Sequence, residues 1–178
     1  QNKVVKLNDK LEYAISISDF SEKILRPTLG KKVKITKIYN PIDIDEIKEK
    51  IDIRKNEYFL YVGRISKEKG VDIFYQAITE LGYEGIVVGD GDKKENLEKI
   101  YTNIDFVGWK NKEEVVRYMK GAKALIFPSR WYETAGLTIL EAQKIGIPCI
   151  VSANSAGKEF IKNGCNGYIF ETIDELKK

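Results

Sequence analysis

The sequence predicts an α/β protein built on a doubly wound parallel sheet, and two observations support this prediction. Short, uninterrupted apolar runs alternate with segments of helical periodicity, and the connections between them are short. An apolar run without polar alternation is typical of a strand that is covered by helices on both faces. Repeated strand–helix units with short loops favour parallel strands joined by right-handed crossovers. We therefore expect a Rossmann-like sheet with helices on both faces.

The regular alternation begins at Tyr58. Residues 58–62 form a continuous apolar run that ends at Gly63, which predicts a buried strand, and residues 71–81 place apolar side chains along one side of a helix. The same reasoning predicts further strands at residues 85–88, 104–107, 124–127, 149–151 and 168–170. It predicts further helices at residues 94–101, 113–120, 134–145 and 156–163. Gly146 and Pro148 fit the end of the third of these helices.

The two ends of the chain fit this alternation less well. The elements expected near the N-terminus are a strand at residues 13–17, a helical turn or two at residues 20–25 and a strand at residues 33–39. Asn40-Pro-Ile-Asp43 then breaks the pattern as a linker would, and residues 172–178 begin a helix and stop. We therefore expect a chain cut from a longer protein. Residues 1–41 would be a remnant of an N-terminal domain and its crossover, and residues 42–178 the Rossmann-like domain, truncated at its C-terminus.

Composition excludes several classes of function. The 178 residues carry a net charge of +3 and the lysines are scattered along the chain, so we expect no nucleic-acid partner. No apolar run reaches the roughly 18 residues that a membrane-spanning helix needs. Cys149 and Cys165 are isolated, and the chain has no histidine, which excludes a zinc site of the usual spacing and a Cys-His or Ser-His nucleophile. We expect two buried, reduced cysteines in a cytoplasmic protein.

The loop after the first buried strand is basic. In an open parallel sheet, ligands bind outside the carboxyl ends of the strands, where this loop lies. Its sequence is Val62-Gly-Arg-Ile-Ser-Lys-Glu-Lys-Gly70, in which Gly63 permits a sharp turn. Arg64 and Lys69 can then converge on an anion, and a diphosphate suits a bidentate arginine beside a lysine point charge. The alternative is a solvated basic turn. The spacing is not that of a phosphate-binding P-loop.

A second loop contains Gly89-Asp-Gly91, which starts like a dinucleotide-binding fingerprint. The third glycine position of that fingerprint holds Lys94, so the match fails. One interpretation is a tight turn between a strand and a helix. The other is a ligand that approaches the glycine backbone closely.

A third loop leads into the helix expected at residues 134–145. Glu133 precedes that helix and Glu141 follows eight residues later, which would separate the carboxylates by roughly 12 Å along the axis. The free amides and positive end of the helix would lie between them. This arrangement suits a nucleotide sugar, with one carboxylate at the sugar hydroxyls, the other at the ribose diol and the amides at phosphate. The alternative is a dipole-stabilising Glu133 and a solvated Glu141, although a carboxylate in an apolar stretch needs partners.

Taken in order, these segments resemble the family-four retaining glycosyltransferases, the glycogen synthase and mannosyltransferase type. The resemblance covers about residues 10–175. The matching segments are Ile38-Tyr-Asn-Pro-Ile-Asp43, Val62 to Gly70, Phe106-Val-Gly108, Pro128-Ser129, Glu133-x7-Glu141-Ala142, Ser152 and Glu159 to Tyr168. The resemblance implies the two-domain GT-B fold, of which this chain would supply the donor-binding half.

The resemblance also implies residue roles. Arg64 and Lys69 would hold the donor diphosphate, Glu141 the ribose and Glu133 the transferred sugar, so that Glu133, Arg64 and Lys69 are the expected catalytic residues. The full expected donor-binding set is Gly63, Arg64, Lys69, Gly89, Gly91, Gly108, Trp109, Lys110, Glu133, Thr134, Ala135, Gly136, Leu137 and Glu141. The amides of residues 135–137 would face the sugar and phosphate, and the backbone of residues 108–110 the base. Thr134-Ala135 departs from the family, where many members carry a bulky residue before the glycine, and this puts the shape of the sugar pocket in doubt.

The resemblance implies transfer of a hexose from a UDP- or GDP-linked donor to a glycan or lipid-linked acceptor, with retention of configuration. Mannose is one candidate for the hexose. No cofactor and no metal are expected, because arginine and lysine neutralise the leaving diphosphate. The acceptor site would lie on the N-terminal domain, so we expect the isolated chain to be inactive. We leave open a peripheral association of the full-length protein with the inner face of the membrane. Two alternatives remain: a sugar-nucleotide epimerase, and a non-catalytic nucleotide-binding module, against which the intact Arg64, Lys69, Glu133 and Glu141 set argues.

Overall fold

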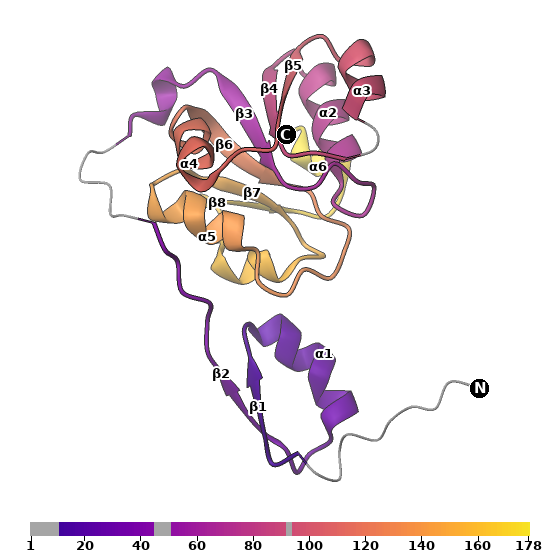
Figure 1. Ribbon diagram of the computed structural model, residues 1–178, viewed down its shortest axis with the longest axis vertical. Coiled ribbons are helices and arrows are strands. Elements are labelled where there is room, and N and C mark those ends of the chain that lie inside the picture. The colour runs from indigo at the N-terminus through magenta and orange to yellow at the C-terminus, as the bar shows by residue number, and fades with distance from the viewer. Residues whose placement is uncertain (1–10, 45–50, 92–93) are drawn as a thin grey trace.

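The computed structural model describes residues 11–44, 51–91 and 94–178, and it contains a small N-terminal unit joined to a larger α/β unit (Figure 1). The larger unit holds a six-stranded sheet in the order β5-β4-β3-β6-β7-β8, and every neighbouring pair is parallel. The strands are β3 (Tyr58–Val62), β4 (Glu84–Val88), β5 (Ile104–Gly108), β6 (Ala122–Phe127), β7 (Cys149–Ser152) and β8 (Gly167–Phe170). The strand order reverses between β3 and β6, which places a topological switch point at their carboxyl ends.

Helices cover both faces of this sheet, as predicted. The helices of this unit are α2 (Val71–Glu80), α3 (Lys94–Ile100), α4 (Lys112–Lys120), α5 (Leu137–Lys144) and α6 (Ile173–Leu176), with short 3-10 helices η2 (Ile53–Lys55) and η3 (Ala156–Phe160). Leu60 faces a hydrophobic cluster completed by α4 and α5, whereas its neighbour Tyr61 faces a second cluster completed by α2 and α3. Successive strand residues therefore bury opposite faces, which explains why the strands read as continuous apolar runs.

Three predicted helices differ from the observed ones. The helix expected at residues 134–145 begins only at Leu137, because Gly136 adopts a left-handed conformation (φ 64°) and breaks the preceding turn. The helix expected at residues 156–163 is the 3-10 helix η3, and η2 was not predicted. The turn expected at residues 20–25 is the eleven-residue helix α1 (Asp19–Leu29), which continues through Pro27.

The N-terminal unit has a sheet of its own. β1 (Tyr13–Ser16) pairs in parallel with β2 (Lys34–Lys37), and α1 connects them. Residues 38–44 have no regular secondary structure, in accord with the predicted linker, and Ile44 packs against the core of the larger unit. The described chain contains no helix that is long and apolar enough to cross a membrane.

The two cysteines differ in their surroundings. Both are free, but only Cys149 is buried, and its burial raises the pKa of the thiol to about 12. Cys165 is exposed, so the prediction of two buried cysteines is wrong for this residue. Cys165 lies in the turn before β8, where the chain runs over the surface.

Candidate functional site

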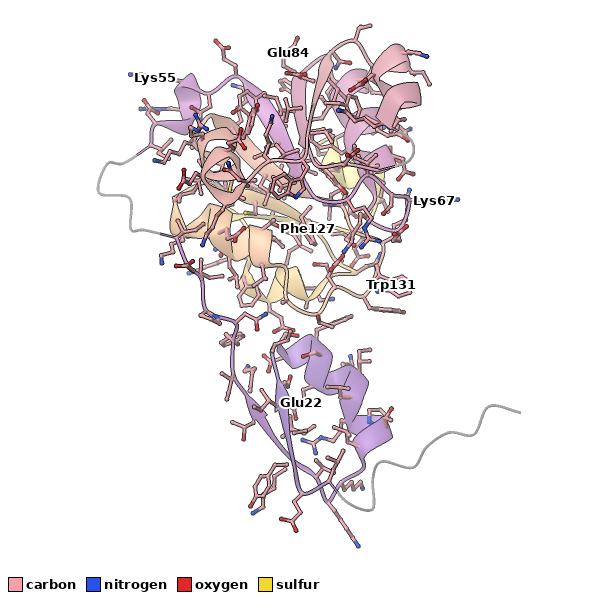
Figure 2. All side chains as sticks on the ribbon, in the orientation of Figure 1. Glu22, Lys55, Lys67, Glu84, Phe127 and Trp131 are labelled. Atoms are coloured by element: carbon pink, nitrogen blue, oxygen red, sulfur yellow. The ribbon has the colours of Figure 1, made fainter. Side chains whose placement is uncertain are left out.

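Two adjoining pockets open at the carboxyl ends of the central strands. The first has a volume of about 410 Å³ and lies at the ends of β3 and β6, at the switch point of the sheet. Its lining residues are Tyr61, Val62, Gly63, Arg64, Lys69, Phe127, Pro128, Ser129, Glu133, Thr134, Ala135, Gly136, Leu137 and Thr138. Most of the expected donor-binding residues therefore share one pocket. Figure 2 shows Phe127 at the end of β6 and Trp131 farther along the following loop.

The second pocket, of about 360 Å³, lies beside β4 and α4. It shares Val62, Gly63 and Arg64 with the first pocket, so one elongated ligand could occupy both. The other residues that line it are Val88, Gly89, Asp90, Trp109, Lys110 and Val115. Trp109 is 73% exposed, so its indole is accessible for stacking on a planar ligand.

The turn at Gly89 and Gly91 is packed against the loop after β3. The amide of Ile65 donates to the carbonyl of Asp90 at 2.9 Å. A Cβ on Gly89 would lie 1.8 Å from the carbonyl oxygen of Gly63, and one on Gly91 would lie 2.2 Å from that of Ile65. These contacts account for both glycines without a ligand. Gly89 also lines the second pocket, whereas Gly91 lines neither.

Lys69 and Glu133, which lie far apart in the sequence, form an ion pair in the first pocket. The ammonium of Lys69 donates to Oε1 of Glu133, and the hydroxyl of Ser129 donates to the same oxygen at 3.1 Å. Gly70 lets the loop that carries Lys69 come close to the loop that carries Glu133. Its left-handed backbone (φ 71°) passes so near Pro128 that a Cβ would lie 2.0 Å from the carbonyl oxygen of Pro128. The sequence predicted both charged residues in the site but not their pairing, nor a role for the buried Ser129.

Arg64 lies at the junction of the two pockets. Its side chain is exposed, while its carbonyl accepts a hydrogen bond from the hydroxyl of Tyr61 at 2.7 Å. Burial, and next the charge of Glu133, raises the pKa of Tyr61, so this hydroxyl stays neutral and donating. The hydrogen bond fixes the backbone of the loop and leaves the guanidinium free to meet a ligand from either side.

The N-terminus of α5 forms one wall of the first pocket. The amides of Ile139 and Leu140 donate to the carbonyl of Gly136 at 3.0 and 3.4 Å, so the preceding amides of Leu137 and Thr138 have no intrahelical acceptor. Both of these residues line the pocket. A helix N-terminus with free amides favours an anion. Thr138 was not among the predicted residues, because the helix was expected to start earlier.

The late start of α5 corrects the predicted spacing of the two glutamates. Glu133 lies four residues before the helix, so the separation of roughly 12 Å deduced for two positions on one helix does not apply. Glu141 lies in the second turn and lines neither pocket. Burial raises the pKa of Glu141, and the positive charge of Lys112 opposes this rise. Lys112 is the first residue of α4, and the same helix supplies Val115 to the second pocket.

Comparison with known proteins agrees with this geometry. A family model described as "Glycosyl transferases group 1" matches residues 43–177. The chain belongs to the group 1 glycosyl transferases. The resemblance to a glycosyltransferase of the GT-B fold is thereby confirmed, and the six-stranded parallel sheet is that of a GT-B glycosyltransferase domain.

Curated relatives of this group 1 glycosyl transferase are about twice its length or more. It is 29% identical over 167 residues to the UDP-Gal:alpha-D-GlcNAc-diphosphoundecaprenol alpha-1,3-galactosyltransferase of Escherichia coli, covering 80% of this chain and 42% of the relative. It is 31% identical over 152 residues to the alpha-monoglucosyldiacylglycerol synthase of Acholeplasma laidlawii, covering 79% and 38%. The chain thus spans less than half of each of these two relatives.

Solved structures share the fold. Anabaena HepE in complex with UDP superposes with a TM-score of 0.80 at 20% identity, covering 96% of this chain and 53% of that one. The sucrose-phosphate synthase of Thermosynechococcus elongatus gives a TM-score of 0.80 at 23% identity, covering 93% and 47%. At these identities the likeness is one of fold.

Proposed function

We propose that this chain supplies the donor site of a retaining glycosyltransferase that transfers a hexose from a UDP-linked sugar. The observation that carries the proposal is the convergence of Arg64, the Lys69–Glu133 pair and the free amides of α5 at the switch point of the sheet. The donor named for the E. coli relative and the UDP bound in Anabaena HepE support UDP as the nucleotide. A GDP-linked hexose, including mannose, is the second candidate.

The diphosphate would lie in the first pocket. Arg64 and Lys69 provide two positive charges there, and the amides of Leu137 and Thr138 add the positive end of α5. These groups would stabilise the charge that develops on the leaving diphosphate. Because the protein itself supplies this charge, we propose that transfer needs no bound metal and no other cofactor.

The transferred sugar would lie next to Glu133. Its carboxylate would accept hydrogen bonds from sugar hydroxyls and stabilise the positive charge that the sugar ring acquires in the transition state. Ser129 holds Oε1 of Glu133 at 3.1 Å, which fixes the direction in which the carboxylate points. In this role Glu133 would form no covalent bond to the sugar. The acceptor would attack the sugar from the same face that the diphosphate leaves, and the configuration would be retained.

The nucleoside would occupy the second pocket. Gly89, Trp109 and Lys110 line this pocket and would surround the base together with the neighbouring backbone of Gly108. Glu141, which lines neither pocket, would accept hydrogen bonds from the ribose hydroxyls of a nucleoside bound there. The charge of Lys112, the first residue of α4, acts on Glu141 and supports this placement, because α4 also lines the second pocket.

The acceptor would be a glycan or a lipid-linked glycan. The diphosphoundecaprenol and diacylglycerol in the names of two relatives support an acceptor at a membrane surface, and with it a peripheral association of the whole protein. We propose that acceptor-binding residues are not contained in this chain, so that the chain binds the donor and transfers no sugar by itself. An epimerase has no feature in this site that favours it.

A thermal-shift panel tests the donor assignment. UDP, UDP-glucose and UDP-galactose should raise the unfolding midpoint of this chain more than GDP and GDP-mannose do. At equal concentration, the ligand that binds the folded state more tightly stabilises it more. A larger shift with GDP-mannose would move the assignment to the second candidate. No shift with any of the five compounds would contradict a donor site, and sugar transfer by the isolated chain at rates typical of complete enzymes would contradict the missing acceptor site.

A further inference from the structure

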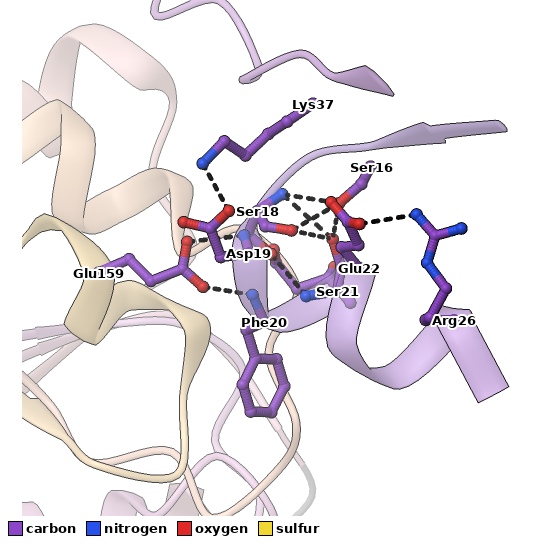
Figure 3. A network of polar contacts seen from close by, with 10 residues as sticks. Ser16, Ser18, Asp19, Phe20, Ser21, Glu22, Arg26, Lys37 and Glu159 are labelled. Carbon is purple, nitrogen blue, oxygen red and sulfur yellow. Dashed lines mark hydrogen bonds and ion pairs between the residues drawn. The ribbon is translucent and has the colours of Figure 1, made fainter. Parts of the chain in front are cut away.

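The N-terminal unit is hydrogen-bonded to the larger unit through Glu159. The carboxylate of Glu159, on η3, accepts hydrogen bonds from the first two amides of α1, that of Asp19 at 2.8 Å and that of Phe20 (Figure 3). These amides have no acceptor within their own helix, and the positive end of the helix favours a carboxylate. Glu159 thus satisfies donors that the serine cap of α1 leaves free.

The same end of α1 contacts the loop that carries Glu133. The hydroxyl of Ser18, fully buried at the N-cap of α1, accepts from the amide of Ser21 and donates to the carbonyl of Thr134 at 2.7 Å. The ring of Phe20 stacks on that of Tyr132, with centroids 5.7 Å apart and an interplanar angle of 27°. Residues on both sides of Glu133 are therefore held by α1.

Glu133 itself is held from η3. The amide of Ala156, the first residue of η3, donates to the carbonyl of Glu133 at 3.0 Å. Earlier in the same loop, the amides of Arg130 and Trp131 donate to the carbonyl of Glu68 at 3.0 and 3.2 Å. The loop is thus held at residues 130–131 by Glu68 and at residues 132–134 by α1 and η3. The backbone of Glu133 belongs to the second of these parts.

We propose that Glu159 is a positioning residue, which docks the N-terminus of α1 and through it holds the Glu133 loop in the geometry that contacts the transferred sugar. The proposal rests on the proposed function, because it is Glu133 that would meet the sugar. Its consequence is that the N-terminal unit and the sugar subsite are coupled: a displacement of α1 moves Glu133 but leaves Arg64 and the amides of α5 in place. Glu159 lines neither pocket.

Amide hydrogen exchange of the ligand-free chain tests the positioning claim without any donor. Glu159→Ala should speed exchange at Ala156 about tenfold, because the Glu133 carbonyl then loses its fixed place, and should leave the sheet amide of Leu125 unchanged. Glu159→Gln keeps one of two acceptors and should give an intermediate rate; it also serves if the alanine variant does not fold. The matched control is Glu84→Ala, an exposed glutamate at the opposite end of the sheet (Figure 2). Unchanged exchange at Ala156 in both Glu159 variants would overturn the proposal.

Titration with UDP and UDP-glucose separates positioning from general stabilisation. The Glu159 variants should bind UDP within about twofold of the unaltered chain, yet lose about threefold to tenfold of the affinity that the glucose adds, which is the worth of roughly one hydrogen bond. Equal losses for both ligands would mean that Glu159 only stabilises the fold, and would overturn the claim. If the unaltered chain binds neither ligand, the proposed function fails, and the exchange experiment still decides whether Glu159 holds the loop.

Discussion

The ion pair between Lys69 and Glu133 leads to a counter-intuitive prediction for Glu133→Gln. In the ligand-free chain the ammonium of Lys69 is already bound by Glu133. A diphosphate must compete with this carboxylate for Lys69 and must also lie beside its negative charge. The substitution removes both penalties and keeps an oxygen that can accept the hydrogen bond from Ser129. We therefore expect Glu133→Gln to bind UDP more tightly than the unaltered chain.

The size of the effect follows from the exposure of the pair. The side chain of Lys69 is 31% exposed and that of Glu133 is 17% exposed, so solvent screens the pair in part. The net worth of such a pair lies near the top of the range for exposed pairs, about 1 kcal/mol, which corresponds to a roughly fivefold lower dissociation constant for UDP. The gain should shrink as salt is added, because screening weakens both the pair and the repulsion.

Isothermal titration calorimetry with UDP and UDP-glucose measures this effect. The ratio of the two affinities should move toward UDP in Glu133→Gln, because the sugar loses a charged acceptor while the diphosphate gains a free lysine. Glu84→Gln removes the same charge at the far end of the sheet and should change neither affinity. If Glu133→Gln bound UDP no more tightly than the unaltered chain at low salt, the competition for Lys69 would be refuted.

Three further predictions follow from the site. Arg64→Ala should weaken UDP binding by about tenfold to a hundredfold, the worth of hydrogen bonds to a charged group, and should leave uridine binding unchanged. An equal loss of uridine affinity in calorimetry would mean that Arg64 does not contact the phosphates. Burial raises the pKa of Glu141, so the folded state disfavours the ionised form of this carboxyl group. Glu141→Gln should therefore raise the unfolding midpoint by a few degrees at neutral pH. The gain should fade as the pH falls toward about 4, because the carboxyl group is then protonated in the folded and the unfolded state alike. A pH-independent gain in thermal melts would mean that the cause is not ionisation. Addition of EDTA should leave the UDP affinity unchanged, and a marked loss that magnesium restores would contradict metal-free binding.

The central strand β3 could be predicted because it is apolar throughout and is covered by a hydrophobic cluster on each face of the sheet. The core residues Leu60 and Tyr61 face different clusters, so no polar position interrupts the run. The start of α5 could not be predicted in the same way. Leu137 is the first helical residue because Gly136 takes a left-handed conformation, and the preceding loop is held by Glu68 and Ala156, which are distant in sequence.

The content of the site could be predicted better than its connections. Loops after strands point to one edge of a parallel sheet, so Arg64, Lys69 and Glu133 were expected together. The pairing of Lys69 with Glu133 depends on the close passage of Gly70 by Pro128, and the Ser18–Thr134 hydrogen bond joins residues 116 positions apart. Local patterns carry no signal for contacts of this kind.

The most direct test of the donor site is a crystal structure of this chain with UDP. We predict that the diphosphate lies between Arg64 and Lys69 and within hydrogen-bond distance of the amides of Leu137 and Thr138. The uracil should lie in the pocket lined by Gly89 and Trp109. The Lys69–Glu133 ion pair should be broken or shared with the diphosphate. UDP bound with its diphosphate outside the first pocket, or with the Lys69–Glu133 pair and Arg64 untouched, would contradict the account.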